Sequence, residues 1–335
     1  MLNRDPESQD VIKAAIFNFE SRHEFIASIK NSQELKRHAK NDIPSRFWHY
    51  STVYDAIEEI TKSAPANIKA SPSHATNFLG VKIRPEFLPE ILYDKIGSVE
   101  EEPIPANWHA DIAEWSSCLR AVNLSDKDYF TMVELGCGWG CWMNNLGVFA
   151  KLSGKNISLY GVEADPKHID FARLAFSDNN ISEKEYTLCQ GIAGAGEGVA
   201  LFPRIESGVD WGGSAILNSK SSKFKALLES NEYDSMPIVD IPLLVKDEKK
   251  IDLVHVDIQG AELELLTELF EFLCKKVKYI FIGTYSKKIE SGLFDLFSNS
   301  GSWSIEMERP AIFRLENGRP IIEVDGVQSW RNDAL

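Results

Sequence analysis

Three glycines alternate with larger residues at one point of the chain, shortly after a carboxylate. Gly136, Gly138 and Gly140 occupy the string VELGCGWG, and Glu134 stands two residues before the first of them. Glycine has no Cβ and adopts backbone angles closed to other residues, so a ligand can approach the backbone itself. An apolar run precedes the string and an amphipathic run follows it, which predicts a strand, a turn and a helix. The glycines then either bind a ligand or simply allow a tight turn.

Two carboxylates near these glycines indicate the kind of ligand. Glu134 would repel a pyrophosphate placed at the helix N-terminus but would attract an ammonium or sulfonium group. Glu163 ends the next strand pattern, SLYGVE, where an acidic side chain accepts hydrogen bonds from both ribose hydroxyls of an adenosine. An exposed strand-end charge is the other interpretation of Glu163. The spacing G-x-G-x-G, followed by Cys141, differs from the G-x-G-x-x-G of dinucleotide-binding folds, which disfavours a nicotinamide cofactor.

Alternating strand and helix patterns must position these residues. From residue 129 onward, β-rich runs alternate with amphipathic runs, which predicts a mostly parallel α/β sheet with helices on both faces. After the first strand, YFTMVEL, the strand candidates are SLYGVE, YTLCQ, VALF, IDLVHVD, KYIFIG, WSIEME and PIIEV. The helix candidates begin near Gly140, Pro166, Ala261 and Lys287. In such a sheet, ligands bind beyond the carboxyl ends of the strands, where the strand order reverses.

The first 125 residues follow a different pattern. Apolar residues at helical spacing predict amphipathic helices within residues 9–40, over residues 47–62 and over residues 109–122. Six prolines between residues 63 and 108 predict loops with short elements between them. We therefore expect a mostly helical N-terminal cap over residues 1–125, which contributes to the acceptor site, and one sheet domain over residues 126–335.

Composition disfavours several classes of partner. With 335 residues, of which 44% are hydrophobic, the chain can bury a substantial core. Its net charge of −14 repels phosphate backbones, so we expect no nucleic acid partner. The first residues lack a signal-like apolar segment, and no run approaches the roughly 18 apolar residues that span a bilayer, which predicts a cytoplasmic protein without a membrane span. A homo-oligomer is compatible with the sequence.

The cysteines and acidic residues show no recognisable metal-binding pattern, and dependence on a divalent metal stays open. Five scattered cysteines favour reduced thiols over a disulfide framework. Cys137 and Cys141 have no second Cys or His pair nearby, so a zinc site is not expected. No set of oxygen donors at a recognisable spacing accompanies Asp257, and a requirement for a divalent metal is therefore not assigned to any residue.

Three strings together resemble the class I S-adenosylmethionine-dependent methyltransferases, and specifically the FkbM family. They are VELGCGWG, YGVEADP and VHVDIQGAELELL. The third resembles the D-[IV]-E-G-A-E-like signature of that family at Asp257, Gly260, Ala261 and Glu262, whereas Gln259 stands where the family usually has an acidic residue. The resemblance covers roughly residues 129–296. It implies a Rossmann-like class I methyltransferase sheet and S-adenosyl-L-methionine as the methyl donor.

The same resemblance implies where the donor binds. Its methionine part would lie along the glycine loop with its ammonium group near Glu134, its ribose at the end of the second strand, and its adenine beside the residues after the third strand. Asp257 would lie next to the transferred methyl group. The residues implied for the methionine part are Glu134, Gly136, Cys137, Gly138 and Gly140. Those implied for the ribose are Glu163 and Ala164, and those implied for the adenine are Gln190, Gly191 and Ile192.

Three residues are candidates for handling the methyl acceptor. A sulfonium is already an activated methyl donor, so the protein needs in-line positioning and a group that takes the proton of the acceptor. Asp257 ends the fourth strand, where it binds the acceptor hydroxyl, receives its proton, helps to hold a metal or caps the next helix. Tyr285 follows the fifth strand, where FkbM relatives often have histidine. With a reference pKa of about 10, tyrosine is better suited to positioning than to proton removal.

His109 is the third candidate and lies outside the methyltransferase-like part. In the string NWHADIAEW it either removes a proton, because histidine titrates near neutrality, or simply begins a helix. For His255, inside a strand pattern, and for Glu262, in the first turn of a helix, structural roles are expected. The string DWGGSAI, residues 210–216, is either an acceptor loop or a turn.

The sequence thus predicts an S-adenosylmethionine-dependent O-methyltransferase acting on a hydroxyl of a sugar, glycan or small natural product. The first alternative is a non-catalytic module that binds an adenosine ligand within a biosynthetic complex. The second is an NAD-dependent dehydrogenase.

Overall fold

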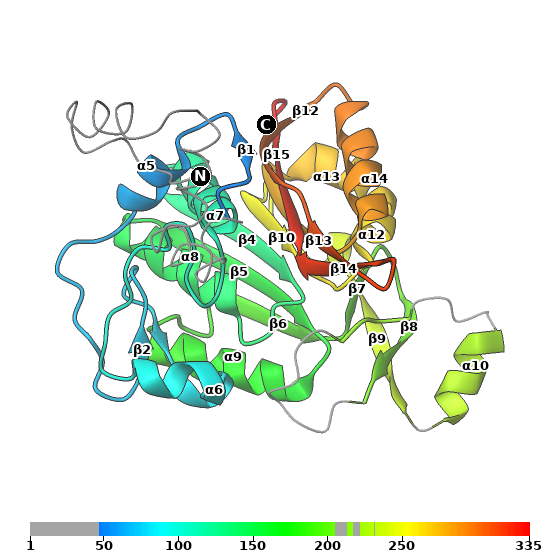
Figure 1. Cartoon of the computed structure of the whole chain (residues 1–335), viewed down its shortest axis with the longest axis horizontal. Helices are drawn as coiled ribbons and strands as arrows, with labels where there is room; N and C mark the ends of the chain where they lie inside the picture. Colours follow the sequence, from blue (N-terminus) through cyan, green and yellow to red (C-terminus); the bar gives the residue numbers. More distant parts are fainter. Residues whose placement is uncertain (1–46, 205–212, 217–221, 231) are drawn as a thin grey trace, which may run out of the picture. The chain divides into compact units, whose positions relative to one another are not determined.

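The computed structural model describes residues 47–204, 213–216, 222–230 and 232–335 (Figure 1). Contacts divide the chain into Met1–His49 and Tyr50–Leu335, and the second unit contains every element considered below. The amphipathic helix predicted within residues 9–40 lies outside the described residues. The division predicted at residues 125 and 126 stays a prediction.

The main sheet of the described residues has eight strands, and the central ones are parallel. Helices join the parallel strands, which is the α/β arrangement predicted from the alternating patterns. In spatial order the strands are β1 (Ser51–Thr52), β12 (Trp303–Arg309), β15 (Gly326–Asn332), β11 (Tyr279–Thr284), β10 (Leu253–Val256), β4 (Tyr129–Leu135), β5 (Asn156–Glu163) and β6 (Tyr186–Gln190).

Side chains alternate along the central strands and build a core on each face of the sheet. In β4, Phe130 and Met132 belong to one hydrophobic cluster, whereas Val133 and Leu135 belong to the other. The first cluster is covered by α7 (Ile112–Leu124), α8 (Cys141–Leu152) and α9 (Pro166–Asp178). The second is covered by α12 (Glu262–Glu268), α13 (Phe270–Lys276) and α14 (Lys287–Ser298). The predicted α/β sheet with helices on both faces is confirmed.

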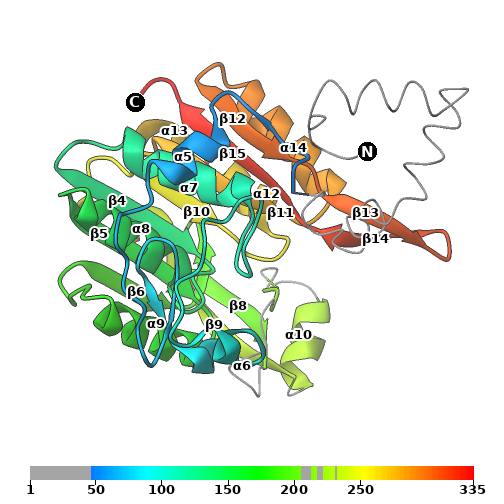
Figure 2. The same cartoon turned by 60° about the vertical axis from the view of Figure 1, so that its left-hand side comes forward.

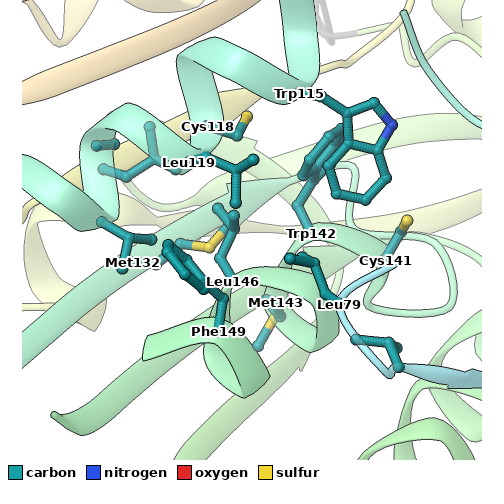
Figure 3. Close-up of a cluster of buried hydrophobic side chains, with 14 of the residues drawn as sticks. Leu79, Trp115, Cys118, Leu119, Met132, Cys141, Trp142, Met143, Leu146 and Phe149 are labelled. Atoms are coloured by element: carbon teal, nitrogen blue, oxygen red, sulfur yellow. The ribbon is translucent and has the colours of Figure 1, made fainter. Parts of the chain in front are cut away.

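The first cluster is packed from aromatic and sulfur-containing side chains. Figure 3 shows Trp115 and Leu119 of α7 opposite Trp142 and Leu146 of α8. The Trp115 and Trp142 rings meet edge to face with centroids 4.7 Å apart. This contact anchors α7 above α8 and thereby fixes the start of α7 at one end of the sheet.

The smaller elements lie around this sheet. One three-stranded sheet has the order β7 (Ile192–Gly194), β9 (Tyr233–Asp240), β8 (Gly198–Pro203). The strands β13 (Ile312–Glu316) and β14 (Arg319–Val324) form a separate hairpin (Figure 2). The short helices are α10 (Ser222–Glu229) and α11 (Ile241–Leu244). Between residues 63 and 108 the structure has β2 (Ala75–Thr76), β3 (Lys82–Ile83), η1 (Pro85–Phe87), α6 (Pro89–Leu92) and η2 (Tyr93–Lys95). Loops with short elements were predicted there.

The helix predicted over residues 47–62 is too long. Ser51 and Thr52 instead pair antiparallel with Glu308 and Met307, and α5 extends only over Ala56–Thr61. Asp55 stops the helix from extending backwards, because its extended backbone lets its side chain accept a hydrogen bond from the N–H of Glu58 as an N-cap. Val53, which the helical pattern would place on the apolar face, is 69% exposed.

Candidate functional site

The glycine loop lies where the strand order reverses. β4 pairs with β5 on one side and with β10 on the other, so the loops after β4 and β10 leave the sheet next to each other. Gly136 has φ +76°, and a Cβ at this position would lie 2.1 Å from the carbonyl oxygen of Asp257. The loop therefore approaches the end of β10 more closely than any larger residue would allow.

A pocket of about 210 Å³ opens at this edge of the sheet. It brings together seven of the residues predicted for the donor, namely Gly136, Gly138, Glu163, Ala164, Gly191, Ile192 and Asp257. The sequence did not single out the remaining lining residues as a donor site: Val162, His168, Ala193, Phe202, Gly213, Ala215, Ile258, Gln259, Ala261 and Leu265.

Glu163 is fixed at one side of this pocket by backbone donors. The N–H of Gly138 donates to Oε2 and the N–H of Asp165 donates to Oε1, both at 2.8 Å. Each carboxylate oxygen can accept more than one hydrogen bond, so capacity remains for a ligand hydroxyl. Asp165 in turn begins α9 as its N-cap, and Pro166 occupies the first helical position. The start of this helix therefore holds the carboxylate at the pocket.

His168 adds a second polar side chain beside Glu163. It lies in the first turn of α9, is 4% exposed, and its Nδ1 is 3.6 Å from Glu163 Oε1. The pocket is otherwise largely apolar near this point, with Ala164, Ile192 and Phe202 among its lining residues. Such a surface with a few placed polar groups suits a flat heterocycle joined to a polyol.

Asp257 lies on the other side of the pocket within a small network of hydrogen bonds. Its Oδ1 accepts a hydrogen bond from the hydroxyl of Tyr285, and Nε2 of Gln259 donates to the same oxygen at 2.9 Å. Gln259 Nε2 also donates to the Tyr285 hydroxyl oxygen at 2.7 Å. Burial is the main cause that raises the pKa of the Asp257 carboxyl and of the Tyr285 phenol. Asp257 and Tyr285, both predicted as catalytic candidates, therefore lie together.

Glu262 braces the loop that carries Gln259. Its Oε1 accepts hydrogen bonds from the N–H of Gly260 at 2.9 Å and of Ile258 at 3.2 Å, and the residue is fully buried. Gln259 has φ +60°, a left-handed backbone that side chains other than glycine rarely adopt. The buried carboxyl group thus holds an unfavourable turn in place, which agrees with the structural role expected for Glu262.

Glu134 does not line the pocket. It is 2% exposed, and its carboxyl group accepts hydrogen bonds from the N–H groups of Trp142 at 3.2 Å and Met143 at 2.9 Å. These are N–H groups at the beginning of α8, which have no partner within the helix. Burial raises the pKa of Glu134 to about 8. In this structure the carboxyl group of Glu134 caps the start of α8 and is not part of the pocket lining.

His109 also lies away from the pocket. Its Nε2 is 2.7 Å from Cys141 Sγ, and its ring lies near the rings of Trp108, Trp115 and Trp142. Burial lowers the pKa of His109 to about 3, so the imidazole is neutral near physiological pH. The contacts place it as a partner of a buried thiol beneath the loop.

Three further predicted residues are close in sequence to the pocket but do not line it. Cys137 is 2% exposed, and its sulfur lies under the loop near Gly161. Gly140, with φ +69°, is the left-handed residue that begins α8. Gln190 ends β6 with an exposed side chain. The pocket instead uses the residues that follow Gln190.

The string at residues 210–216 contributes to the pocket through its second half. Gly213 and Ala215 line the pocket, and Ile216 pairs with Leu201 of β8. Asp210, Trp211 and Gly212 lie outside the described residues. The two adjacent glycines and the serine of this string were the available signal for a ligand-facing segment.

Among the described residues, no group of three or more His, Cys, Asp or Glu side chains is arranged to hold a metal ion. Within the same residues, no helix has both the length and the apolar character needed to cross a bilayer.

Comparison with known proteins gave one similar sequence and several distant structures. No family model matches the chain. A protein of Jannaschia sp. (strain CCS1) named "Putative methyltransferase" is 42% identical over 270 residues, which are 79% of this chain and 95% of that protein. A solved methyltransferase FkbM from Methylobacillus flagellatus KT has a TM-score of 0.40 and 14% identity over 62% of this chain and 44% of its own. The METTL16 MTase domain has a TM-score of 0.35 and 13% identity over 65% of each chain.

Proposed function

The chain belongs to the methyltransferase family, and from this premise we propose that it transfers a methyl group from S-adenosylmethionine to a hydroxyl group. The proposed acceptors are sugars, glycans or small natural products, as the likeness of its three motif strings to the FkbM family implies. One observation carries the proposal: a single pocket joins Glu163 on one side to Asp257 on the other at the switch point of the sheet.

The residues of the pocket fit the proposed donor. Glu163 is held so that its oxygens can accept hydrogen bonds from a ribose diol, and apolar residues such as Ala164 and Ile192 suit an adenine ring. The donor brings a methyl group on a positively charged sulfur. Asp257 supplies the carboxyl group toward which such a charge is drawn.

The polar network at Asp257 fits an acceptor hydroxyl. Tyr285 and Gln259 both bond Oδ1 of Asp257, which fixes the carboxyl group in one orientation. A group held in this way orients an acceptor for in-line transfer. The loop after β10 reads Asp-Ile-Gln-Gly and lacks the Asn-Pro-Pro-Tyr-like string expected for amino methylation of a base. We therefore propose oxygen as the methylated atom.

The N-terminal part, residues 1–125, is proposed to complete the acceptor site. α7 belongs to this part, and its first turn lies at the same edge of the sheet as Asp257, because Glu114 contacts His255 of β10. We also propose a cytoplasmic location, in keeping with the five cysteines, all of which are free thiols.

Donor binding and methyl transfer are tested separately. We expect S-adenosylhomocysteine, but not NADH, to raise the melting temperature of the protein, since a ligand that binds the folded state stabilises it. We expect labelled methyl from S-adenosylmethionine to appear on an acceptor from a panel of sugars, nucleotide sugars and glycans. A shift with NADH alone would contradict the proposed donor. Donor binding without transfer to any acceptor would indicate a non-catalytic module.

A further inference from the structure

A glutamate that no sequence pattern singled out lies near Asp257, close enough for its charge to act on that carboxyl group. Glu114, in the first turn of α7, has Oε1 3.2 Å from Nε2 of His255. His255 and Asp257 are two residues apart on the same chain segment, so their side chains leave the same face of the sheet. The side chain of Glu114 is 21% exposed, whereas that of His255 is 2% exposed. Glu114 is thus the member of the pair that solvent or an acceptor can reach.

The imidazole of His255 is held rigidly between two aromatic rings. It stacks on Phe281 at 4.9 Å with an interplanar angle of 15°, and on Trp142 at 5.4 Å with an angle of 29°. Burial lowers the pKa of His255 to about 4, so the ring is neutral near physiological pH. A neutral imidazole has a single N–H.

The position of that N–H follows from the contacts of the ring. Among the described residues, Nδ1 of His255 is buried without a hydrogen-bond partner. A buried N–H without a partner is costlier than an unused lone pair, so we assign the proton to Nε2, which then donates to Glu114. The side chain of Trp142 lies close enough to Glu114 to favour the ionised form of its carboxyl group. The N–H of His255 therefore orients this carboxyl group.

The groups around Glu114 are mostly acidic. Its carboxyl group interacts electrostatically with Asp111, Asp325 and Asp257, and the cation among these neighbours is Arg309. Arg309 Nε lies 2.6 Å from Asp111 Oδ2, so its charge is largely matched by Asp111. Burial first, and then Asp111, raise the pKa of Glu114 to about 8.

We propose that Glu114 takes the proton of the acceptor hydroxyl, with His255 as the residue that positions its carboxylate. This inference rests on the proposed O-methyl transfer. The acceptor oxygen forms a bond to the methyl carbon while the carbon–sulfur bond of the donor breaks and its electron pair stays on sulfur. The hydroxyl proton passes to a carboxylate oxygen of Glu114 and leaves later to solvent, which balances the step.

The other candidates are less suited to this proton transfer. Tyr285 and Gln259 both donate to Oδ1 of Asp257, which fixes this carboxyl group for binding the acceptor hydroxyl rather than for taking its proton. His109 contacts the buried thiol of Cys141, and burial lowers its pKa to about 3, which makes it a weak base near neutral pH. A base is most effective when its pKa lies near the working pH, and this favours Glu114, which also has the exposure that contact with an acceptor requires.

The test compares Glu114→Gln, Glu114→Asp and Asp257→Asn with the wild type over pH 6 to 10. We expect kcat of the wild type to rise with pH to a plateau above about 8. Glu114→Gln keeps an oxygen for the N–H of His255 but cannot take a proton, so kcat should fall at least about 100-fold, with little change in the affinity for S-adenosylhomocysteine. Glu114→Asp should keep the pH-dependent rise at a lower kcat. Glu58→Gln, an exposed glutamate in the first turn of α5, is the matched control and should behave as wild type.

His255→Phe tests the positioning role, because phenylalanine preserves the stacking but removes the hydrogen bond to Glu114. The ionised carboxylate loses a donor, so the pH-dependent rise of kcat should move to higher pH. The inference is overturned if active wild type and Glu114→Gln differ in kcat by less than about threefold. It is also overturned if Asp257→Asn abolishes the pH-dependent rise while Glu114→Gln retains it. A wild type that binds S-adenosylhomocysteine but methylates no acceptor overturns the proposed function itself.

Discussion

Two backbone N–H groups fix the carboxylate of Glu163 before any ligand binds. They come from Gly138 in the glycine loop and from Asp165 at the start of α9. A group that is already oriented loses little conformational entropy on binding. The Glu163 carboxylate therefore links the two loops that flank the pocket, because it accepts a hydrogen bond from each of them.

Replacing Glu163 with alanine should weaken donor binding specifically. Hydrogen bonds to a charged group contribute about 1.5–3 kcal/mol each, so the affinity for S-adenosylhomocysteine should fall roughly 10- to 100-fold. Isothermal titration calorimetry measures this change, and thermal denaturation shows whether the variant is folded. Glu183→Gln, at an exposed position after α9, serves as the control. Unchanged affinity in folded Glu163→Ala would contradict the proposed role.

Individual pocket residues could be predicted from the sequence where they stand at the ends of predicted strands. Gly136, Glu163 and Asp257 were predicted because each stands at or just after the carboxyl end of a parallel strand, and these ends meet at one edge. Glu134 was placed at the same edge, but the sequence does not show that its side chain turns toward the start of α8. Glu114 could not be predicted, because its partner His255 lies 141 residues away in the chain.

At the level of elements, a buried carboxyl group controls the start of α8. Glu134 bonds the N–H groups of Trp142 and Met143, while burial raises its pKa from 4.5 to about 8. Between these pH values the folded state binds a proton at Glu134 that the unfolded state has released. The contribution of this group to the free energy of unfolding therefore falls as the pH rises from about 4.5 to about 8.

Replacing Glu134 with glutamine should remove this pH dependence. At pH 5 the wild type carries a neutral carboxyl group, and both proteins present a neutral side chain to α8. As the pH rises to 9, the wild type must bury a charge that the variant lacks, so the melting temperature of the variant should gain several degrees relative to wild type. Thermal denaturation at pH 5, 7 and 9 measures the difference. Glu264→Gln, exposed in the first turn of α12, is the control, and a difference independent of pH would contradict the argument.

The order of elements was more predictable than their pairing. The strands and helices from β4 to α9 and from β10 to α14 follow the predicted alternation, because each parallel strand is a nearly continuous apolar run before an amphipathic helix. PIIEV forms β14 of a separate hairpin, whereas the later segment Gly326–Asn332 enters the main sheet as β15. β15 pairs antiparallel with β11 and β12, and such long-range pairing leaves no local sequence signal.

At the level of the whole sheet, charge is distributed unevenly between its two edges. Asp257, Asp325, Asp111 and Glu114 gather at the carboxyl edge, where Arg309 is the opposing cation named above. At the amino edge, Lys155, Lys250 and Lys278 lie near one another and near Asp126 and Asp252. The pocket opens at the edge that carries these carboxyl groups, in a chain whose net charge is −14. A net negative charge attracts a cationic donor and repels a polyanion.

We expect no measurable binding of mixed-sequence RNA or DNA oligonucleotides at about 0.15 M ionic strength. Proteins that bind nucleic acid nonspecifically gain affinity as salt is lowered, because their cations replace condensed counterions. Here, lowering the ionic strength extends the Debye length from about 8 Å toward 30 Å and strengthens repulsion at the pocket. Fluorescence anisotropy over 0.02–0.3 M salt measures oligonucleotide binding. The control is kcat/KM for a neutral glycan acceptor, which should change little with salt. Oligonucleotide binding that tightens as salt is lowered would contradict the prediction and would point to the lysines of the amino edge, where phosphates would find the nearest concentration of positive charge.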